Sequence, residues 1–425
     1  VPSYRPFGGL MPAANYRMMR KTPTLSNGLI CSSLTDGTAL GVSMATGSLV
    51  WEVKVGRDVG NDIGFVASQD GIMVGDADSN PLVGGGGTKV YALNTSNGNF
   101  LWDFKVDAGV WNFLPYFVGD GTVMIQGWDG GAYRLRLADG SLVWRAGGSA
   151  ATTWTDGGPV LGPNGIFYVV SSSAPQSDSW RGKPGFLHAY NVTDGRVVWS
   201  RPLEETPYTY PAVGRLHKDG PLTVVTGVGS LAFMPLKIQL LMTCVPAGFF
   251  LGLLMYLCYV VCWKRCRCGC LSCFWQLPLA VVTAVLLMVP YVSLFMLKSE
   301  YPYSVQAFDA NTGAAIWRHD LPTYKWYSAV GDEEGLMTRV RNSRIPFCLP
   351  LASGYPTIDA NGVFYLGHMD GRLHIIKDRD QDGKVDNTTE YCSLDVGSGF
   401  SSGGPSVVPG MLAFSTCDTT FVYKF

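Results

Sequence analysis

Two long apolar runs near the middle of the chain restrict most strongly what this sequence can fold into. Residues 238–262 and 277–297 form stretches of 25 and 21 residues without a charged side chain. A membrane-spanning helix needs about 20 apolar residues to cross a hydrocarbon core of about 30 Å. The sequence therefore predicts a transmembrane helical hairpin within residues 231–300. The alternative is a buried hairpin of a soluble core, but such helices are usually amphipathic, and these runs are apolar on every face.

The short segment between the two runs predicts the orientation of the hairpin. Residues 263–276 read WKRCRCGCLSCFWQ, and Lys264, Arg265 and Arg267 follow the first run closely. Basic loops are retained on the cytoplasmic side of a membrane, or on its equivalent in an organelle. Because two spans return the chain to its starting side, residues 1–230 and 301–425 are expected to share the opposite, lumenal or extracytoplasmic side. The hairpin is then an insertion into one domain, not a link between two domains.

The same segment carries a cluster of thiols. Cys266, Cys268, Cys270 and Cys273 lie beside the basic residues. Cysteines that adjoin a membrane span are typical sites of S-acylation, and acylated or plain reduced thiols are the favoured interpretation. A metal site is the alternative, although structural zinc usually needs two paired CxxC motifs.

Composition narrows the class of the remaining chain. The 425 residues carry a net charge of −1, which argues against nucleic acid as a partner because such proteins present a basic face. The 52 glycines and 12 tryptophans suit a β architecture rich in turns. Residues outside the hairpin suffice for one large all-β domain or for two ordinary ones.

An internal repeat sets the expected fold. Each copy has alternating apolar residues, a tight turn with glycine, and then a tryptophan, and successive tryptophans lie 51, 42 and 55 residues apart in the first four copies. This spacing approximates the 40–50 residues of a propeller blade, and a second hairpin before most copies gives four strands per unit. We expect the tryptophans to fill the core between adjacent sheets. The copies contain Trp51, Trp102, Trp144, Trp199 and Trp317, and residues 372–394 form a sixth that lacks the tryptophan.

The repeat resembles that of the quinoprotein-like (PQQ-repeat) β-propellers. Residues 90–102, residues 307–317 and the half-repeat at 364–373 carry the pattern. The resemblance implies an all-β propeller, and counting the repeats gives about six, or six to eight, four-stranded blades. It also implies relatives as different as quinone-dependent dehydrogenases and a bacterial outer-membrane assembly lipoprotein, so it specifies the fold more than the function.

The repeat also predicts how the blades close and where the hairpin enters. The last segment, residues 403–425, and the first tryptophan repeat are expected to form one blade from both termini, which would make Cys31 and Cys417 neighbours. Four soluble thiols, Cys31, Cys348, Cys392 and Cys417, can pair in three ways, and the spacing does not choose between them. The hairpin falls between a strand at 222–229 and one from residue 304, and residues 325–350 fit no blade.

An acidic loop at residues 378–390 predicts a calcium site. Ca²⁺ prefers six to eight oxygen ligands, and a DxDxDG loop supplies them from alternate positions. The expected ligands are Asp378, Asp380, Asp382, the carbonyl of Lys384 and Asp386. Position 12 of the loop is Thr389 and Glu390 comes one residue late, so a bidentate glutamate is not assured. We expect a structural staple between two strands, with no flanking helices; a merely solvated acidic turn is the alternative.

Other motifs point away from catalysis. The sequence has no Cys-Cys pair of the kind found near the quinone in quinone-dependent dehydrogenases, so pyrroloquinoline quinone is not an expected cofactor. The five histidines show no metal-binding spacing, and His368 and His374 are expected to be ordinary blade residues. Three glycosylation sequons, at Asn94, Asn191 and Asn387, are close to the number expected by chance.

These features predict a membrane-anchored propeller without catalytic activity. It would serve as a scaffold, assembly or accessory subunit of a larger membrane complex, in contact with the lipid bilayer and with other subunits. Thylakoid, inner-mitochondrial and secretory membranes all remain possible locations. One alternative is a quinone- or ligand-binding oxidoreductase, and another is a cell-surface receptor or adhesion protein.

Overall fold

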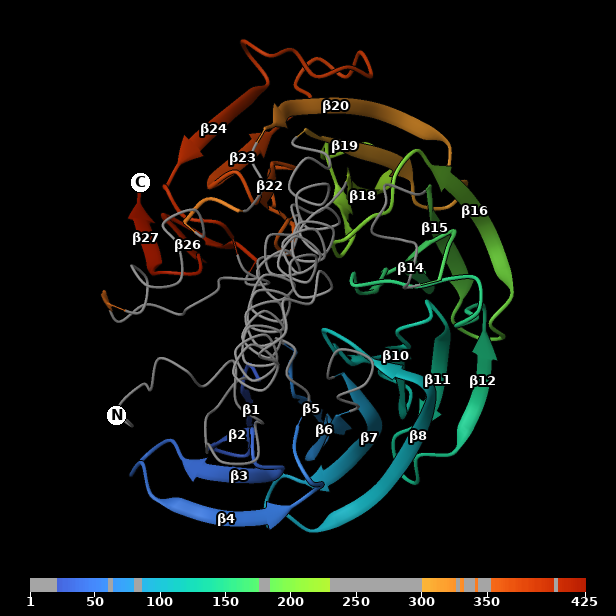
Figure 1. Cartoon of the computed structure of the whole chain (residues 1–425), viewed down its shortest axis with the longest axis vertical. Coiled ribbons are helices and arrows are strands. Elements are labelled where there is room, and N and C mark those ends of the chain that lie inside the picture. The colour runs from blue at the N-terminus through green and yellow to red at the C-terminus, as the bar shows by residue number, and fades with distance from the viewer. Residues whose placement is uncertain are drawn as a thin grey trace, which may run out of the picture. The chain divides into compact units, whose positions relative to one another are not determined.

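The computed structural model of the chain describes nine ranges, most of them in β-strands (Figure 1). The described ranges are residues 21–59, 64–79, 86–175, 184–229, 300–325, 329–331, 341–342, 353–400 and 404–425. Two compact units are distinguished: the first contains residues 1–231, 302–323 and 329–425, and the second contains residues 232–301 and 324–328. The predicted transmembrane hairpin and its cysteine-rich loop lie outside the described residues, as does most of the segment from 325 to 350. Within the described residues, no helix is both long enough and apolar enough to span a membrane.

The described strands form seven antiparallel sheets, and each sheet is built from strands that are consecutive in the sequence. The first three sheets contain β1 (Thr24–Ser26), β2 (Leu29–Leu34), β3 (Thr38–Ser43) and β4 (Leu49–Lys54); β5 (Ala67–Gln69), β6 (Ile72–Ser79), β7 (Gly87–Asn94) and β8 (Phe100–Val110); and β9 (Tyr116–Phe117), β10 (Thr122–Gln126), β11 (Ala132–Arg136) and β12 (Leu142–Ala146). The next two contain β13 (Val160–Leu161), β14 (Ile166–Ser172), β15 (Gly185–Asn191) and β16 (Val197–Leu203); and β17 (Ala212–Arg215), β18 (Leu222–Gly229), β19 (Tyr301–Asp309) and β20 (Ala315–Tyr324). The last two contain β21 (Thr357–Ile358), β22 (Phe364–Gly367), β23 (Arg372–Ile376) and β24 (Tyr391–Asp395); and β25 (Ser406–Val408), β26 (Met411–Ser415) and β27 (Thr420–Lys424).

The strand order within each sheet confirms the predicted all-β propeller architecture. Six sheets have four strands and the seventh has three among the residues described. Within the first unit, Figure 1 shows the sheets following one another in chain order, with the last strand of each sheet on the outer side. Strands near the middle of a sheet are covered on both faces by neighbouring sheets; in β14, for example, all seven residues are buried. This explains why such strands read as continuous apolar runs.

Tryptophan side chains join successive sheets, as the repeat predicted. Trp51, Trp102, Trp199 and Trp317 are between 4% and 8% exposed, and Trp144 is partly buried. In four sheets the indole N–H of the fourth strand donates a hydrogen bond to the carbonyl that follows the third strand of the next sheet. The pairs are Trp51 with Thr95 (2.7 Å), Trp102 with Leu137 (2.7 Å), Trp144 with Val192 (2.8 Å) and Trp199 with Ala310 (3.0 Å).

The turn after each of these carbonyls contains a glycine that lies on the same indole ring. Gly98, Gly140, Gly195 and Gly313 all have positive φ, from 68° to 73°. A Cβ at any of these four positions would come within 2.7 Å of the tryptophan of the preceding sheet. Glycine is therefore required at this turn position for two reasons. The backbone has a positive φ, and the indole ring leaves no room for a Cβ.

The expected sharing of one blade between the two termini is wrong for the described residues. The Trp51 repeat has a complete sheet of its own, β1 to β4, and the last segment forms the separate sheet β25 to β27. The sequence signal for the missed hairpin is Asn27-Gly28, whose φ angles of 51° and 73° belong to the tight turn between β1 and β2. An Asn-Gly pair between apolar residues is a strong hairpin signal, and it lies upstream of the part of the repeat that contains Trp51.

Three of the four soluble thiols lie among the described residues. Cys31 is buried and free, Cys392 is exposed and free, and Cys417 is disulfide-bonded. Cys31 and Cys417 are therefore not disulfide-bonded to each other. Burial raises the pKa of the Cys31 thiol to about 11, so this side chain behaves as part of the core and not as a reactive group.

The strands on either side of residues 230–299 pair with each other directly. β18 and β19 are antiparallel, with Thr223 opposite Asp309 and Gly229 opposite Tyr303. The two strands thus belong to one sheet although about seventy residues separate them in the sequence. Residues opposite each other in an antiparallel pair are about 4.5–5.5 Å apart, so the chain leaves the sheet and returns to it at one place.

Candidate functional site

The predicted calcium loop connects β23 and β24 in the sixth sheet, with no helix on either side. The carboxylates of Asp378, Asp380 and Asp382 come within 4.8 Å of one another. Asp378 is buried, whereas Asp380 and Asp382 are exposed. Burial raises the pKa of the Asp378 carboxyl, and the negative charges of Glu390 and Asp380 add to this effect. Three of the five predicted ligand residues therefore gather, and their charges oppose one another unless a cation lies between them.

The backbone of the loop is already wrapped around these carboxylates. The N–H of Gln381 donates to Asp378 Oδ1 at 2.8 Å, and the N–H of Lys384 donates to Asp382 Oδ1 at 2.8 Å. Gln381 has a φ of 63°, a left-handed conformation that is unusual for a residue other than glycine. Each of these two aspartates therefore forms a local turn and leaves a second carboxylate oxygen that can serve a cation.

Asp386 and Glu390 do not join the three gathered carboxylates and instead accept hydrogen bonds from backbone N–H groups of the loop. Asp386 Oδ1 accepts hydrogen bonds from the backbone N–H groups of Thr388 (2.8 Å) and Thr389 (2.9 Å), and the hydrogen bonds from these two residues lower the pKa of Asp386 to about 2. Glu390 accepts hydrogen bonds from the N–H groups of Arg379, Asp380 and Asp386. Asp386 is thus not among the gathered carboxylates, and Glu390, which the sequence places one residue late, closes the loop from its far end.

The loop occupies the place that the tight turn holds in other sheets. Val385 packs against the apolar core that contains Trp317. Gly383, the glycine of the loop, lies beside the carbonyl of Ile316 and not on an indole ring. Among the residues described, the indole N–H of Trp317 has no hydrogen-bond partner. The acidic loop therefore replaces the indole–carbonyl contact at the junction between the fifth and sixth sheets.

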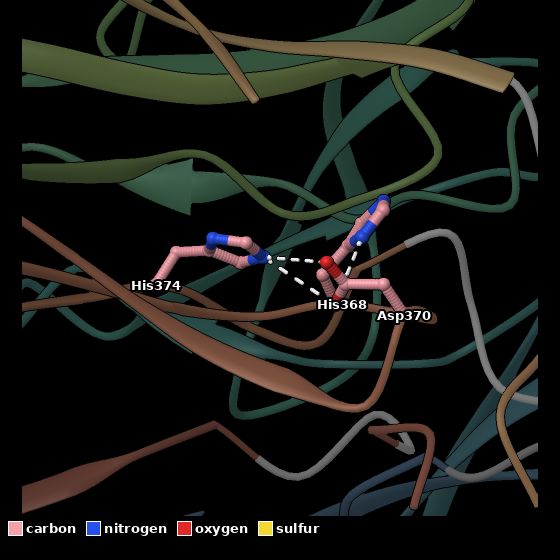
Figure 2. Close-up of side chains that lie close together, drawn as sticks. All are labelled: His368, Asp370 and His374. Carbon is pink, nitrogen blue, oxygen red and sulfur yellow. Dashed lines mark hydrogen bonds and ion pairs between the residues drawn. The ribbon is translucent and has the colours of Figure 1, made fainter. Parts of the chain in front are cut away.

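A second cluster lies at the opposite end of β23, around the turn from β22 (Figure 2). His368 follows β22, Asp370 lies in the turn, and His374 is in β23. His374 Nε2 is 3.1 Å from Asp370 Oδ2, and His368 Nδ1 is 3.3 Å from Asp370 Oδ1. Figure 2 shows the two imidazole rings on either side of the carboxylate. The three ligand atoms lie within 4.8 Å of one another.

Burial and charge shape the electrostatics of this cluster. The side chains of His368 and His374 are 0% exposed and that of Asp370 is 11% exposed. Burial opposes ionisation of Asp370, but the charge of His368 and the hydrogen bonds from both histidines hold its pKa far below the usual value. Burial also lowers the pKa of His374. The arrangement keeps a carboxylate ionised in a site that excludes most water.

Aromatic residues of two sheets surround the cluster. The Tyr391 hydroxyl is 2.9 Å from His374 Nδ1, and the two rings are stacked. The Tyr303 ring lies 4.5 Å from that of His368, and its hydroxyl is 2.5 Å from Ser353 Oγ. Tyr303 belongs to β19 of the fifth sheet, so the cluster lies at the junction of the fifth and sixth sheets.

The sequence did not predict this cluster, because its five histidines read as scattered. The available signal was the spacing His-x-Asp-Gly-x-x-His across a short hairpin. Leu366 pairs with His374 in that hairpin, and the His368 N–H bonds to the Arg372 carbonyl. A tight turn therefore brings positions 368, 370 and 374 to one end of the hairpin.

Two of the three sequons have a structural origin. Asn94 Oδ1 accepts from the N–H of Ser96 at 2.9 Å, and Asn191 Oδ1 accepts from the N–H of Thr193 at 2.8 Å. Asp309 makes the same contact with the N–H of Asn311 in the fifth sheet. Three of the five tryptophan repeats have Asn or Asp at this turn position, where the side chain favours the turn, so turn chemistry accounts for the asparagines of these two sequons.

Comparison with known proteins supports the fold. Residues 35–224 match the family described as outer membrane protein assembly factor BamB. No curated protein sequence matches the chain. Among solved structures, BamB from Moraxella catarrhalis is similar with a TM-score of 0.53 and 15% identity, over 96% of this chain and 86% of that chain. The quinohemoprotein alcohol dehydrogenase ADHIIG from Pseudomonas putida HK5 is similar with a TM-score of 0.50 and 11% identity, over 98% of this chain and 65% of that chain. Likeness at these identities concerns the fold.

Proposed function

We propose that this BamB-like β-propeller is a membrane-anchored assembly factor or accessory subunit of a larger membrane protein complex, on the extracytoplasmic side. The observation that carries the proposal is the direct pairing of β18 with β19 across the long apolar insertion. The similarity of residues 35–224 to an outer membrane protein assembly factor supports the assembly role.

The pairing of these strands supports a hairpin anchor. Gly229 and Tyr303 lie opposite each other, so both ends of the insertion start from the same end of one pair of strands. A chain that enters a membrane from this point must come back to the side of the membrane from which it entered. The two apolar runs, residues 238–262 and 277–297, are each long enough for one crossing, and an even number of crossings satisfies the strand pairing.

The disulfide of Cys417 supports the extracytoplasmic side. Disulfides persist in oxidising compartments and are rare where glutathione and thioredoxin keep thiols reduced. The five cysteines at 262–273 would then lie on the reducing side, where Cys266, Cys268, Cys270 and Cys273 can be acylated or remain thiols. The basic residues at 264, 265 and 267 would attract anionic lipid headgroups there.

The acidic loop fits a structural calcium ion within this function. Asp378, Asp380 and Asp382 would supply carboxylate oxygens, with carbonyl groups such as that of Lys384 and water to complete the shell. Asp386 would join only by giving up its hydrogen bonds to residues 388 and 389. The ion would stiffen the loop that replaces the tryptophan turn, and so would help to close the propeller between its fifth and sixth sheets.

Thiol labelling in intact membranes tests the topology. Cys392 is a native exposed thiol after the insertion, and Ser48→Cys places one in an exposed turn before it. A membrane-impermeant maleimide should label both positions from one side and any thiols at 266–273 that are not acylated from the other, while the buried Cys31 stays unlabelled. Labelling of positions 48 and 392 from opposite sides would exclude the hairpin.

Purification in mild detergent tests the role in a complex. The full chain, solubilised from native membranes and tagged within the exposed turn at 45–48, should elute with other membrane proteins at a mass well above that of a single chain. Elution as a lone chain, in the same detergent that preserves known complexes of that membrane, would contradict the assembly role. Activity with pyrroloquinoline quinone and a redox dye would favour the oxidoreductase alternative.

A further inference from the structure

We infer that His368, Asp370 and His374 form a binding site for a divalent transition-metal cation of the zinc class. The site is separate from the acidic loop, which lies at the other end of β23 and offers only oxygen ligands. The inference rests on the donor atoms, on the distances between them, on their burial and on the partner that orients His374.

The distances match a metal coordination shell. Zn²⁺ binds imidazole nitrogen and carboxylate oxygen at about 2.0–2.2 Å, so neighbouring ligand atoms of a tetrahedral site are about 3.3–3.5 Å apart. Asp370 Oδ1 is 3.3 Å from His368 Nδ1 and 3.4 Å from His374 Nε2. Two edges of the tetrahedron are therefore present around one oxygen atom. The third edge, between the two nitrogens, does not exceed 4.8 Å.

The donor set selects the kind of cation. Two imidazole nitrogens and one carboxylate suit zinc and neighbouring first-row metals, whereas calcium prefers six to eight oxygen atoms. Three protein ligands leave a fourth position for water or for a donor from outside the site. Asp370, the only member of the three with an exposed fraction above zero, marks the side from which a cation and its water would enter.

The surroundings of His374 fix the orientation of its ring for a metal. A metal-ligating histidine usually donates its other ring N–H to a fixed acceptor, which sets the tautomer. Tyr391 provides that acceptor, 2.9 Å from His374 Nδ1. In the metal-free cluster Nε2–H donates to Asp370. A bound cation would take the place of that proton, and the ring proton would then lie on Nδ1, toward Tyr391. A strand neighbour therefore positions the ligand before any cation arrives.

The rival explanation is a buried His–Asp–His hydrogen-bond network that never binds a metal. Both explanations are consistent with these short distances, but only the metal site predicts saturable binding of Zn²⁺ that depends on these side chains. Zinc could also bind the thiols at 266–273, so the experiment needs a background in which Cys266, Cys268, Cys270 and Cys273 are replaced by serine. The full chain in detergent, stripped with a chelator and then dialysed against limiting Zn²⁺, is the material to use.

In that background we expect one Zn²⁺ per chain by elemental analysis. Tyr391→Phe should weaken binding by about tenfold, the lower limit for loss of an orienting partner, and His374→Gln should weaken it further. His188→Gln is the matched control, because His188 is a blade histidine whose ring contacts Ser171 and Ser200 at 3.3 Å and 2.9 Å. Unchanged Zn²⁺ binding in His374→Gln, or no Zn²⁺ binding by the parent chain, would overturn the proposal.

Cobalt provides a readout on the unsubstituted cluster, which is needed if a variant does not fold. In the same serine background, Co²⁺ should give the visible absorption of a four-coordinate nitrogen and oxygen site, and Zn²⁺ should abolish it in a one-to-one titration. Excess Ca²⁺ should leave the absorption unchanged. A spectrum identical to that of hydrated Co²⁺ would also overturn the proposal.

Discussion

Gly140 lies against the indole ring of Trp102, so close that a Cβ at position 140 would come within 2.6 Å of the ring. The two residues belong to successive sheets, and Gly140 has a φ of 71°. The contact recurs in three further turns of the propeller. It makes the glycine of each turn part of the junction with the preceding sheet, and it explains why the turn and the tryptophan occur together in the sequence repeat.

Gly140→Ala is expected to destabilise the propeller by about 2–5 kcal/mol. The left-handed backbone alone costs an alanine about 1–2 kcal/mol, and the displaced Trp102 ring adds a packing cost of about 1–3 kcal/mol. Chemical denaturation of the detergent-solubilised chain, followed by near-ultraviolet circular dichroism, measures the difference in the free energy of unfolding.

Gly47→Ala is the matched control for this substitution. Gly47 has a φ of 69° and donates its N–H to the carbonyl four residues earlier, as Gly140 does, but no neighbouring atom lies within 4 Å of the position that a Cβ would take. Its replacement should cost only the backbone contribution. Equal losses of stability in the two variants would show that the contact with the ring contributes nothing to the free energy of unfolding.

Trp102→Phe should cost more stability than Trp317→Phe, by about 1–3 kcal/mol. The two tryptophans are 5% and 4% exposed, so the loss of buried ring area is similar. Trp102 donates to the Leu137 carbonyl at 2.7 Å, whereas Trp317 Nε1 has no partner among the described residues. Phenylalanine at 102 leaves a buried carbonyl without its indole donor, and phenylalanine at 317 removes an unsatisfied donor.

Parallel denaturation of these two variants and the parent chain provides the measurement. A larger loss for Trp317→Phe would mean that the sixth-sheet junction depends on its indole in a way that the hydrogen bonds do not explain. Loss of the same size in both would assign the whole effect to ring packing.

The features that could be predicted from the sequence are those whose contacts are local in the chain. The tryptophan junctions were predictable because one short turn pattern repeats with a nearly regular spacing. The gathering of Asp378, Asp380 and Asp382 was predictable because their spacing lies within one loop. The hairpin from β1 to β2 was missed because Asn27-Gly28 is its only strong signal and it precedes the recognisable repeat.

The role of Glu390 and the histidine cluster could not be predicted in the same way. Glu390 reaches back over ten residues to the N–H of Asp380, and this depends on the path of the loop. His368 and His374 meet Asp370 only because the strand register places all three at one end of a hairpin. Tyr303 and Tyr391 complete the cluster from two different sheets, a relationship that a linear pattern does not contain.

Stability at acid pH should depend on Asp120. A hydrogen bond from the Thr122 hydroxyl and the charge of Arg134 hold the pKa of the Asp120 carboxyl below its usual value. Arg134 in turn reaches the Val192 carbonyl in the next sheet, at 2.9 Å. Because the folded pKa is the lower one, this stabilisation is complete above about pH 4, the usual aspartate pKa, and is lost as the pH falls through the folded value.

Asp120→Asn should therefore lower the melting temperature at pH 7 and have a smaller effect as the pH falls below about 4. Thermal melts of the variant and the parent chain from about pH 7 to about pH 3 span the usual aspartate pKa and give the comparison. A difference that stays constant across this range would show that Asp120 acts through something other than its charge.

Calcium should stabilise the chain through the loop between β23 and β24. Binding to the folded state alone raises stability by about 2.7 kcal/mol when the free Ca²⁺ concentration is a hundred times the dissociation constant. Asp382→Asn removes one of the three gathered charges and should abolish most of this gain, since calcium affinity follows the number of charged ligands. Melting temperatures measured with Ca²⁺ and with a Ca²⁺ chelator give the size of the effect.

Asp139→Asn is the control for the calcium experiment. Asp139 is an exposed aspartate in the turn between β11 and β12, and its Oδ1 accepts from the N–H of Ser141 at 2.9 Å, a contact that asparagine can retain. Its replacement removes the same charge without touching the loop, so the response to Ca²⁺ should equal that of the parent chain. If Asp382→Asn and Asp139→Asn respond to Ca²⁺ alike, the ion does not bind at the acidic loop, and the carboxylates there only shape the backbone.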